Sequence, residues 1–395
     1  MDWLRKILDD LAPHFDKGRK LEKFYPLFEA TDTILFSTDE RTHSGPHIRD
    51  SVDIKRVMIL VVISLIPCYI FGAFNIGYQE SLTYGLSGTD WNRNFLSGLF
   101  KIIPILAVTF ATGAFWEILF AIIRRHPISE GFLVTCALIP LTLPVTIPLW
   151  QVAIGTSFGI VIGKEIFGGV GMNIFNPALM TRAFLYFTYP VQISGDKVWA
   201  LAPDGFSGAT ALSIPAGELN NNAVNLLNNA TINTVFDFSW LNMFMGWIPG
   251  SIGETNKLII IFSALFLIIT GITSWRIMLG SLLGLVSTAF LTNIMAPYSS
   301  NSMLTIPPHY HIVMGSFLFG TVFMATEPVT GAHTEKGKWI YGFFIGMLTV
   351  IIRSINPAYP EGIMLAILLM NAFAPLIDYF VVKSNIKKRL LRYAQ

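Results

Sequence analysis

One short polar loop interrupts the long apolar stretches of this chain: Asp204-Gly205-Phe206-Ser207-Gly208-Ala209-Thr210. Its two glycines allow close backbone approach to a bulky group. Ser207 and successive backbone N–H groups could cradle an anion, and Thr210 supplies a hydroxyl that could carry a phosphoester. The same residue types dominate ordinary turns for local conformational reasons. The residues alone therefore leave a phosphate-bearing loop and a plain extracytoplasmic turn both open.

Ionisable side chains inside apolar stretches are the second group of candidates, because charge in a membrane is costly and usually marks function. They are Glu117, Lys164-Glu165, Glu327 and Asp378. Buried carboxylates are suitable oxygen ligands or gates for a hard cation. A structural ion pair near a helix end is the alternative for Lys164-Glu165, and a solvated helix terminus is the alternative for Glu117 and Asp378.

Two asparagines, Asn173 and Asn176, flank a glycine-rich turn before an apolar run that starts at Pro177. Their amides could bond the edge of a ring, although asparagine before proline is also ordinary helix capping. Gly113 and Ala114 could leave room for a flat ligand or simply allow close helix packing. His309 and His311 have no plausible third ligand nearby. We expect them to be interfacial polar anchors, and the sequence predicts no metal cluster.

The composition indicates a membrane protein. Hydrophobic residues make up 53% of the 395 residues, charged residues only 13%, and the mean hydropathy is +0.57. This charge content cannot cover the surface of a soluble protein of this size. A net charge of +2, without a basic cluster that has aromatic residues interleaved, argues against nucleic-acid binding. Cys68 and Cys136 lie in apolar stretches, as structural residues would, and are too few for an iron–sulfur cluster.

The chain contains about ten apolar runs that are long enough to cross or nearly cross a bilayer. This pattern predicts an all-α polytopic membrane protein with some helices broken. Pro140, Pro144 and Pro148 interrupt the third run, and weak internal echoes suggest two pseudo-repeated halves. The approximate extents of these runs are 57–75, 102–123, 131–150, 151–168, 174–190, 258–273, 277–296, 311–326, 339–353 and 361–382.

The distribution of Lys and Arg predicts the orientation. A polar extension, residues 1–55, carries apolar residues at helical spacing and is expected to lie in the cytoplasm with an interfacial helix. The membrane domain is expected to span residues 56–383. The loop 191–257 holds only Lys197 and Lys257 as basic residues, so it and Thr210 are predicted to face outward. An even number of spans, about ten, places the basic tail 384–395 on the same side as residues 1–55. Both termini are therefore predicted to be cytoplasmic.

Several longer motifs carry a family resemblance. They are FEATDTILF, HIRDSVDIKRVMI, TGAFWEILF, GKEIFGG, NIFNPALMTRAFLYF, RSINPAYPEGIMLAIL and NAFAPLIDYFVV, together with the loop DGFSGAT. Over essentially the whole chain the sequence resembles the NqrB/RnfD family of membrane subunits, found in the Na⁺-translocating NADH:quinone oxidoreductase and in the Rnf complex. The resemblance implies a ten-helix bundle in two halves, similar to urea- and ammonium-channel folds, in a bacterial inner membrane.

The resemblance also implies cofactors and partners. A flavin transferase would esterify FMN onto Thr210, with Asp204, Ser207 and Gly208 in the FMN loop. Noncovalent riboflavin would lie near Asn173 and Asn176. Electrons would arrive from a second covalent-FMN subunit, and ultimately from a subunit that oxidises NADH with FAD and an iron–sulfur centre. They would leave on ubiquinone or menaquinone.

By the same resemblance, the quinone region would include Gly113 and Ala114, and the sodium path would involve Glu117, Glu327 and Asp378. This chain departs from the family pattern at two of these positions. Ala114 replaces a common glycine, and Glu327 replaces a common aspartate.

Two other functions stay open at this point. The Rnf-type subunit, which serves a ferredoxin:NAD⁺ oxidoreductase, shares Ser-Gly-Ala-Thr but generally lacks the extension seen in residues 1–55. A channel or secondary transporter without redox chemistry would also explain buried carboxylates on this fold. Covalent flavin in the denatured chain would exclude the latter.

Overall fold

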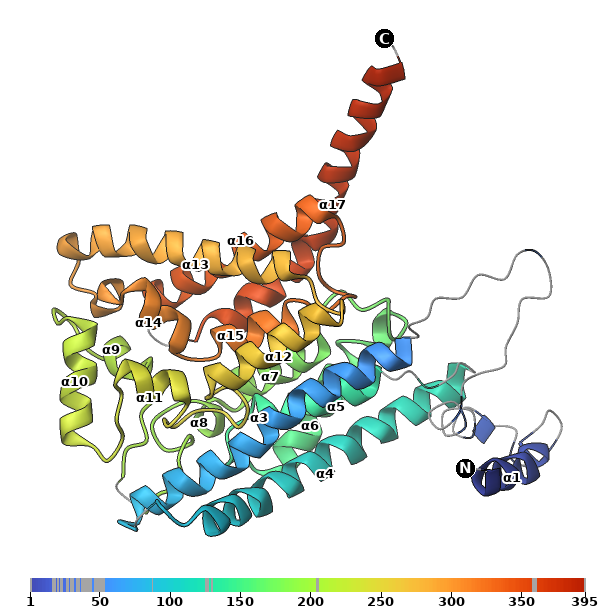
Figure 1. Ribbon diagram of the computed structural model, residues 1–395, viewed down its shortest axis with the longest axis horizontal. Coiled ribbons are helices and arrows are strands. Elements are labelled where there is room, and N and C mark those ends of the chain that lie inside the picture. Colours follow the sequence, from blue (N-terminus) through green and yellow to red (C-terminus); the bar gives the residue numbers. More distant parts are fainter. Residues whose placement is uncertain are drawn as a thin grey trace.

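The computed structural model describes residues 2–15, 54–86, 88–124, 131–203, 206–356 and 361–393, with residue 128 and isolated positions between 16 and 53. Helices dominate these ranges (Figure 1). Outside the helices, the described residues contain one isolated antiparallel bridge, between Leu219 and Asn301. The all-α prediction is confirmed.

Five helices are long and apolar enough to cross a membrane. They are α3 (Ile54–Thr83), α4 (Trp91–Arg124), α13 (Trp275–Met295), α16 (Glu335–Ile355) and α17 (Ile363–Tyr393). Shorter helices occupy four further apolar runs: α5 (Gly131–Leu141), α6 (Leu149–Val161), α7 (Pro177–Thr188) and α12 (Lys257–Ile269). The chain is therefore a polytopic membrane protein. Nine of the ten predicted runs correspond to one helix each, with shifted ends, and the run 311–326 is divided among several elements.

The packing divides the bundle into two similar halves. In the first half α4 packs on α5 and α6, and α6 packs on α7. In the second half α13 packs on α14 (Pro308–Val313) and α16, and α16 packs on α17. The halves meet where α3 contacts α12 and where α7 contacts α17. In this arrangement α6 of the first half corresponds to α16 of the second. The sequence echo instead relates Pro148–Gly155, at α6, to Pro308–Gly315, at α14, so it does not follow the structural repeat.

The third segment of each half is broken, as the prolines of the first half predicted. Helix α5 stops at Leu141, well before the expected residue 150. The expected span 311–326 divides into α14, α15 (Phe317–Phe319) and a π-helical turn, η6 (Gly320–Met324). The break lies at Gly315, whose φ of +64° is a backbone conformation that residues other than glycine rarely adopt. Broken helices of this kind bring backbone and polar groups into the bundle.

A second, smaller core holds the segment between the halves. Short helices α8 (Pro190–Ile193), α9 (Ser213–Ala216), α10 (Ala223–Asn233) and α11 (Trp240–Met245) belong to this segment. Leu212, Leu227, Phe236 and Met243 are among its buried residues, and Phe206 packs against Phe236 at 5.6 Å between ring centroids. Figure 1 shows this segment at the end of the bundle opposite the start of α3 and the end of α4.

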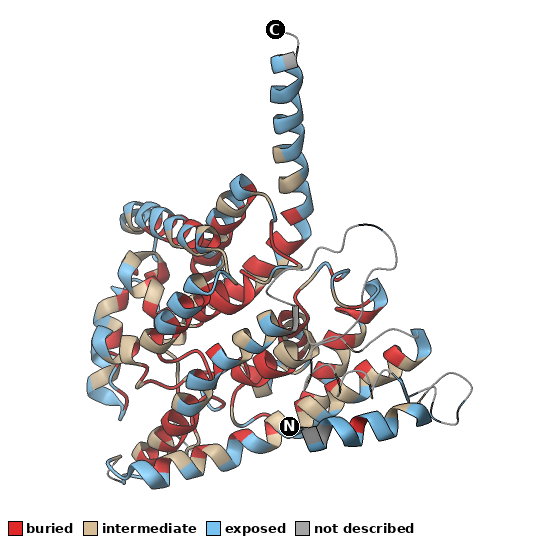
Figure 2. Cartoon of the chain, turned by 45° about the vertical axis from the view of Figure 1, so that its right-hand side comes forward, coloured by how far each residue is buried: buried red, intermediate tan, exposed pale blue. Residues whose placement is uncertain are grey.

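Burial follows the same division. Buried residues line the contacts between helices, whereas the outer faces and the far end of α17 are exposed (Figure 2). On α4, the exposed face carries large apolar residues such as Phe100 and Phe115. The N-terminal helix α1 (Asp2–Leu11) is amphipathic, as its sequence predicted, with Leu8 buried and Trp3 exposed. Three short 3₁₀ turns, η1 (Ala12–His14), η3 (Glu165–Phe167) and η4 (Ala296–Tyr298), and a longer one, η5 (Ser302–Thr305), complete the described elements.

Candidate functional site

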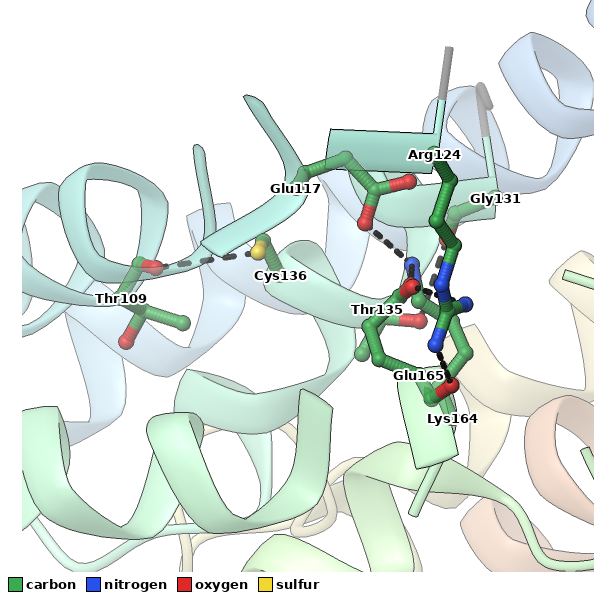
Figure 3. A network of polar contacts seen from close by, with 8 residues as sticks. All are labelled: Thr109, Glu117, Arg124, Gly131, Thr135, Cys136, Lys164 and Glu165. Atoms are coloured by element: carbon green, nitrogen blue, oxygen red, sulfur yellow. Dashed lines mark hydrogen bonds and ion pairs between the residues drawn. The ribbon is translucent and has the colours of Figure 1, made fainter. Parts of the chain in front are cut away.

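Glu117 and Lys164 form an ion pair inside the first half. Glu117 extends from α4 toward Lys164, which precedes η3, and both side chains are at most 3% exposed (Figure 3). Glu165 lies 3.5 Å from the same ammonium group and 3.1 Å from Arg124 at the end of α4. Two buried carboxylates thus share two cations. The structural ion pair considered for Lys164-Glu165 is present, and Glu117 is not at a solvated terminus.

Asn173 and Asn176 line an open cavity, beside α3, α5 and the segment after η6. Its volume is about 60 Å³, and its walls are mostly apolar. Lys164 and Glu327 are the charged side chains among its described lining residues, and Lys164 is paired with Glu117. Both asparagine amides face Glu327. The structure therefore brings a predicted sodium residue and the two predicted riboflavin residues to one cavity.

The side chain of Asn176 has two functions at once. Its Oδ1 accepts from the backbone N–H groups of Ala178 at 3.0 Å and Leu179 at 3.2 Å, which caps α7. The capping interpretation is therefore confirmed. Because the oxygen makes the cap, the Nδ2 donor stays on the cavity side, facing Glu327. Capping consequently fixes the direction in which this amide points.

The two predicted quinone residues lie on different sides of α4. Gly113 is buried, and a Cβ at this position would collide with the sulfur of Cys136 on α5. Ala114 is half-buried, and the next residue, Phe115, is 59% exposed. Neither Gly113 nor Ala114 lines the cavity of Asn173 and Asn176. Close packing accounts for Gly113, while Ala114 borders the outer face of α4.

Asp378 of α17 holds the turn that precedes α16. Its carboxylate accepts from the N–H groups of His333 at 2.7 Å and Thr334 at 3.0 Å, and from the Thr334 hydroxyl at 2.5 Å. Thr334 in turn caps α16 through the N–H of Gly337. Asp378 is half-buried and connects two helices of the second half, so it is not a freely solvated terminus.

Thr210 lies half-buried at the edge of the second core. Its hydroxyl is 3.3 Å from Ser213 Oγ and accepts from the Ser213 N–H at 3.3 Å. It lines a small cavity together with Lys257, Glu254 and Glu361. Ser207 is exposed, and Asp204 lies outside the described residues.

Gly208 contributes to this loop through packing. Its N–H donates to the backbone oxygen of Asp196 at 2.7 Å, and a Cβ would lie 3.2 Å from the Cβ of Ala200. This amide is therefore occupied by the protein. The anion-binding nest that the sequence suggested at Ser207 and Gly208 is not formed through the Gly208 N–H.

A buried charge cluster beside Thr210 was not predicted from the sequence. Arg182 of α7 forms ion pairs with Glu361 and, at 3.7 Å, with Glu254. Arg353 of α16 donates from Nε to the backbone oxygen of Glu361 at 3.0 Å. Lys257 starts α12 and donates to the backbone oxygen of Glu254 at 2.7 Å. Arg182 and Arg353 interrupt apolar runs, which was the signal that could have identified the cluster.

Two residues predicted at the surface are buried. The sequence placed Lys257 in an outward loop, but its side chain is 1% exposed and belongs to the bundle. His311 was expected to be an interfacial anchor, but it is fully buried and its backbone oxygen accepts from Arg353 at 2.7 Å. Both residues lie on segments whose local sequence suits a surface, and contacts with residues distant in sequence, such as that of His311 with Arg353, bury them.

Comparison with known proteins settles the family. Residues 41–387 match the model of the NQR2, RnfD, RnfE family. The chain belongs to this family.

Relatives in the NQR2, RnfD, RnfE family match almost the whole chain. A protein of Chromohalobacter salexigens, named as the B subunit of Na(+)-translocating NADH-quinone reductase, is 50% identical, covering 99% of this chain and 97% of that protein. Proteins of the same name from Ectopseudomonas mendocina and Yersinia pestis are 47% and 45% identical, covering 98% of this chain and 99% of each protein. These alignments extend beyond the family match into the first 40 residues.

Proposed function

We propose that this chain is the B subunit of a sodium-pumping NADH:quinone oxidoreductase. The observation that carries the proposal is its near full-length similarity, at 45–50% identity, to proteins bearing that name. In this proposal the chain passes electrons from FMN on Thr210, via riboflavin, to ubiquinone or menaquinone, coupled to Na⁺ export. Its partners are a second covalent-FMN subunit and an NADH-oxidising subunit with FAD and an iron–sulfur centre.

Thr210 is the proposed point of FMN attachment. Its half-buried hydroxyl borders a cavity that contains a buried lysine, a suitable environment for an anionic ester. During maturation by a flavin transferase, the Thr210 oxygen would form a bond to the phosphorus of an activated flavin dinucleotide. The phosphoanhydride bond would break, and the hydroxyl proton would be released with the departing nucleotide. The attached flavin supplies the redox chemistry, and the protein fixes its position.

The cavity of Asn173, Asn176 and Glu327 is the proposed riboflavin site. Ligand pockets usually combine apolar walls with a few polar groups, as this cavity does. The Asn176 Nδ2 donor and the nearby Thr135 and Thr326 supply such groups. Because Lys164 is paired with Glu117 and the other charged side chain among the described lining residues, Glu327, is acidic, the cavity suits a neutral flavin better than a phosphorylated one.

The proposed location is the bacterial inner membrane, with both termini in the cytoplasm and Thr210 on the outer side. The basic residues of the tail 384–395 favour this orientation. The position of the second core, opposite the start of α3, agrees with it (Figure 1). Glu117, Glu327 and Asp378 remain the proposed sodium-path residues.

The decisive experiment is in-gel flavin fluorescence of the denatured chain, expressed with a flavin transferase. We expect Thr210→Ala to abolish the signal and Ser207→Ala, a matched change in the same loop, to retain it. Fluorescence that persists in Thr210→Ala would refute the attachment. NADH-driven quinone reduction stimulated by Na⁺ in the assembled complex then separates this function from the ferredoxin-linked one. A chain without any flavin would support a channel or transporter.

A further inference from the structure

The buried charges beside Thr210 do not balance. Arg182, Arg353 and Lys257 are three cations, and Glu254 and Glu361 are two carboxylates, all within one electrostatically interacting cluster. Arg182 of the first half pairs with Glu254 and Glu361, and Arg353 donates to the backbone oxygen of Glu361. Among the residues that the structure describes, the cluster carries one excess positive charge. An unpaired buried charge costs several kcal/mol, so an excess of this kind calls for an anion.

Lys257 is the cation of this cluster that has unused hydrogen-bond donors. It is 1% exposed, and its ammonium group donates to one backbone oxygen, that of Glu254, at 2.7 Å. Arg182 pairs with both Glu361 and Glu254, and Arg353 donates to three backbone oxygens. Within the part of the chain that the structure describes, Lys257 forms no ion pair and has this one acceptor. An ammonium group has three donors. Lys257 therefore retains donors for a further acceptor.

The small cavity beside Lys257 reaches Thr210. Lys257 and Thr210 both line this cavity, and Gly250 and Gly315 form part of its wall. At Gly315 a Cβ would collide with the side chain of Leu212, so bulk is excluded at this wall. Thr210 and Lys257 are 47 residues apart in sequence, and the second core and α12 bring them to the same cavity.

We propose that Lys257 is the counter-ion of the phosphodiester that joins Thr210 to its flavin; this inference rests on the FMN attachment proposed above. A phosphodiester keeps a single negative charge, which equals the excess charge of the cluster. Lys257 is thus a positioning residue that acts on the phosphate, away from the redox-active ring. Before attachment its charge is uncompensated, and after attachment it is paired. Flavin attachment should therefore stabilise the folded chain through Lys257.

The test is a thermal-unfolding cycle on the full-length purified chain, expressed with the transferase, with covalent flavin measured by in-gel fluorescence. Thr210→Ala is compared with the parent in three backgrounds: unchanged, Lys257→Met and Lys197→Met. Lys197 is the matched control, because it is an exposed lysine of the same 191–257 segment. Lys257→Arg keeps the charge, and Lys257→Gln replaces Lys257→Met if the latter accumulates poorly.

We expect Thr210→Ala to lower Tm by about 4 °C in the unchanged and Lys197→Met backgrounds, and by less than about 1 °C in Lys257→Met. A fall in covalent flavin in Lys257→Met that Lys257→Arg restores supports the same assignment. An equal Tm loss from Thr210→Ala in all three backgrounds would overturn it while the covalent flavin of the parent stands. A parent chain without covalent flavin would overturn the proposed function and this inference together.

Discussion

Glu117 on α4 and Lys164 before η3 form an ion pair whose two side chains are 2% and 3% exposed. The pair joins the second helix of the first half to the turn that leads into α7 (Figure 3). Lys164 also lines the cavity of Asn173 and Asn176, so the pair connects a predicted sodium residue to the proposed riboflavin site. Any change at Glu117 must therefore alter both charge balance and cavity shape.

Glu117→Gln is expected to destabilise the chain by about 3 kcal/mol, because it leaves Lys164 buried with only Glu165 nearby. Thermal unfolding measures the loss. Glu335→Gln is the control, since that carboxylate is exposed and its ion pairs should contribute little to stability. The double variant Glu117→Gln/Lys164→Met should recover part of the loss. If the double variant is less stable than Glu117→Gln, the pair is not the source of the effect.

Asn176→Asp should keep the cap of α7 and lose the Nδ2 donor, while adding a negative charge that faces Glu327. We expect the affinity for riboflavin to fall at least tenfold, about 1.4 kcal/mol, and Tm to fall as well, because the added charge is buried. Extracted flavin quantified by chromatography measures this. Asn222→Asp is the matched control, because Asn222 caps α10 through Val224 at 2.9 Å, away from the cavity. Full riboflavin content and turnover in Asn176→Asp would leave capping as the only function of this residue.

Gly113→Ala is expected to cost about 1–3 kcal/mol, since the added methyl group meets the Cys136 sulfur. Cys136→Ala in the same chain removes the obstacle and should restore stability. Quinone KM and inhibitor sensitivity are then measured in the double variant and in Ala114→Gly, which adds no volume. Unchanged quinone kinetics in both would mean that this part of α4 serves helix packing alone.

Asp378→Asn removes one of the two acceptor oxygens that hold His333 and Thr334. We expect a stability loss of about 1–2 kcal/mol and a weaker apparent affinity for Na⁺ in quinone reduction, with flavin content unchanged. Turnover at varied Na⁺ concentration measures the second effect. Thr334→Val is the control, because it removes the hydroxyl bonded to Asp378 but keeps the carboxylate. If both variants change Na⁺ dependence equally, the turn before α16 is responsible, and the carboxylate is not a direct sodium ligand.

The sequence by itself determined the membrane class and the approximate place of each helix. Apolar runs such as 102–123 and 339–353 are long enough to span a bilayer, and the polar residues around them limit where a helix can end. The breaks near Pro144 and within 311–326 were also predictable, because proline and glycine interrupt helical hydrogen bonding locally. The Asn176 cap followed from Asn-Pro at a helix start.

Only the tertiary structure decided which charged residues meet. Glu117 and Lys164 are 47 positions apart, and Arg182 and Glu361 are 179 apart, so no local pattern pairs them. The burial of Lys257 and His311 likewise depends on tertiary contacts, among them those with Arg353 of α16. Local propensity determines the secondary structure within about one helical turn of each residue. Which buried charges pair depends instead on how the helices pack against one another. For this reason the candidate residues were found from sequence and their partners were not.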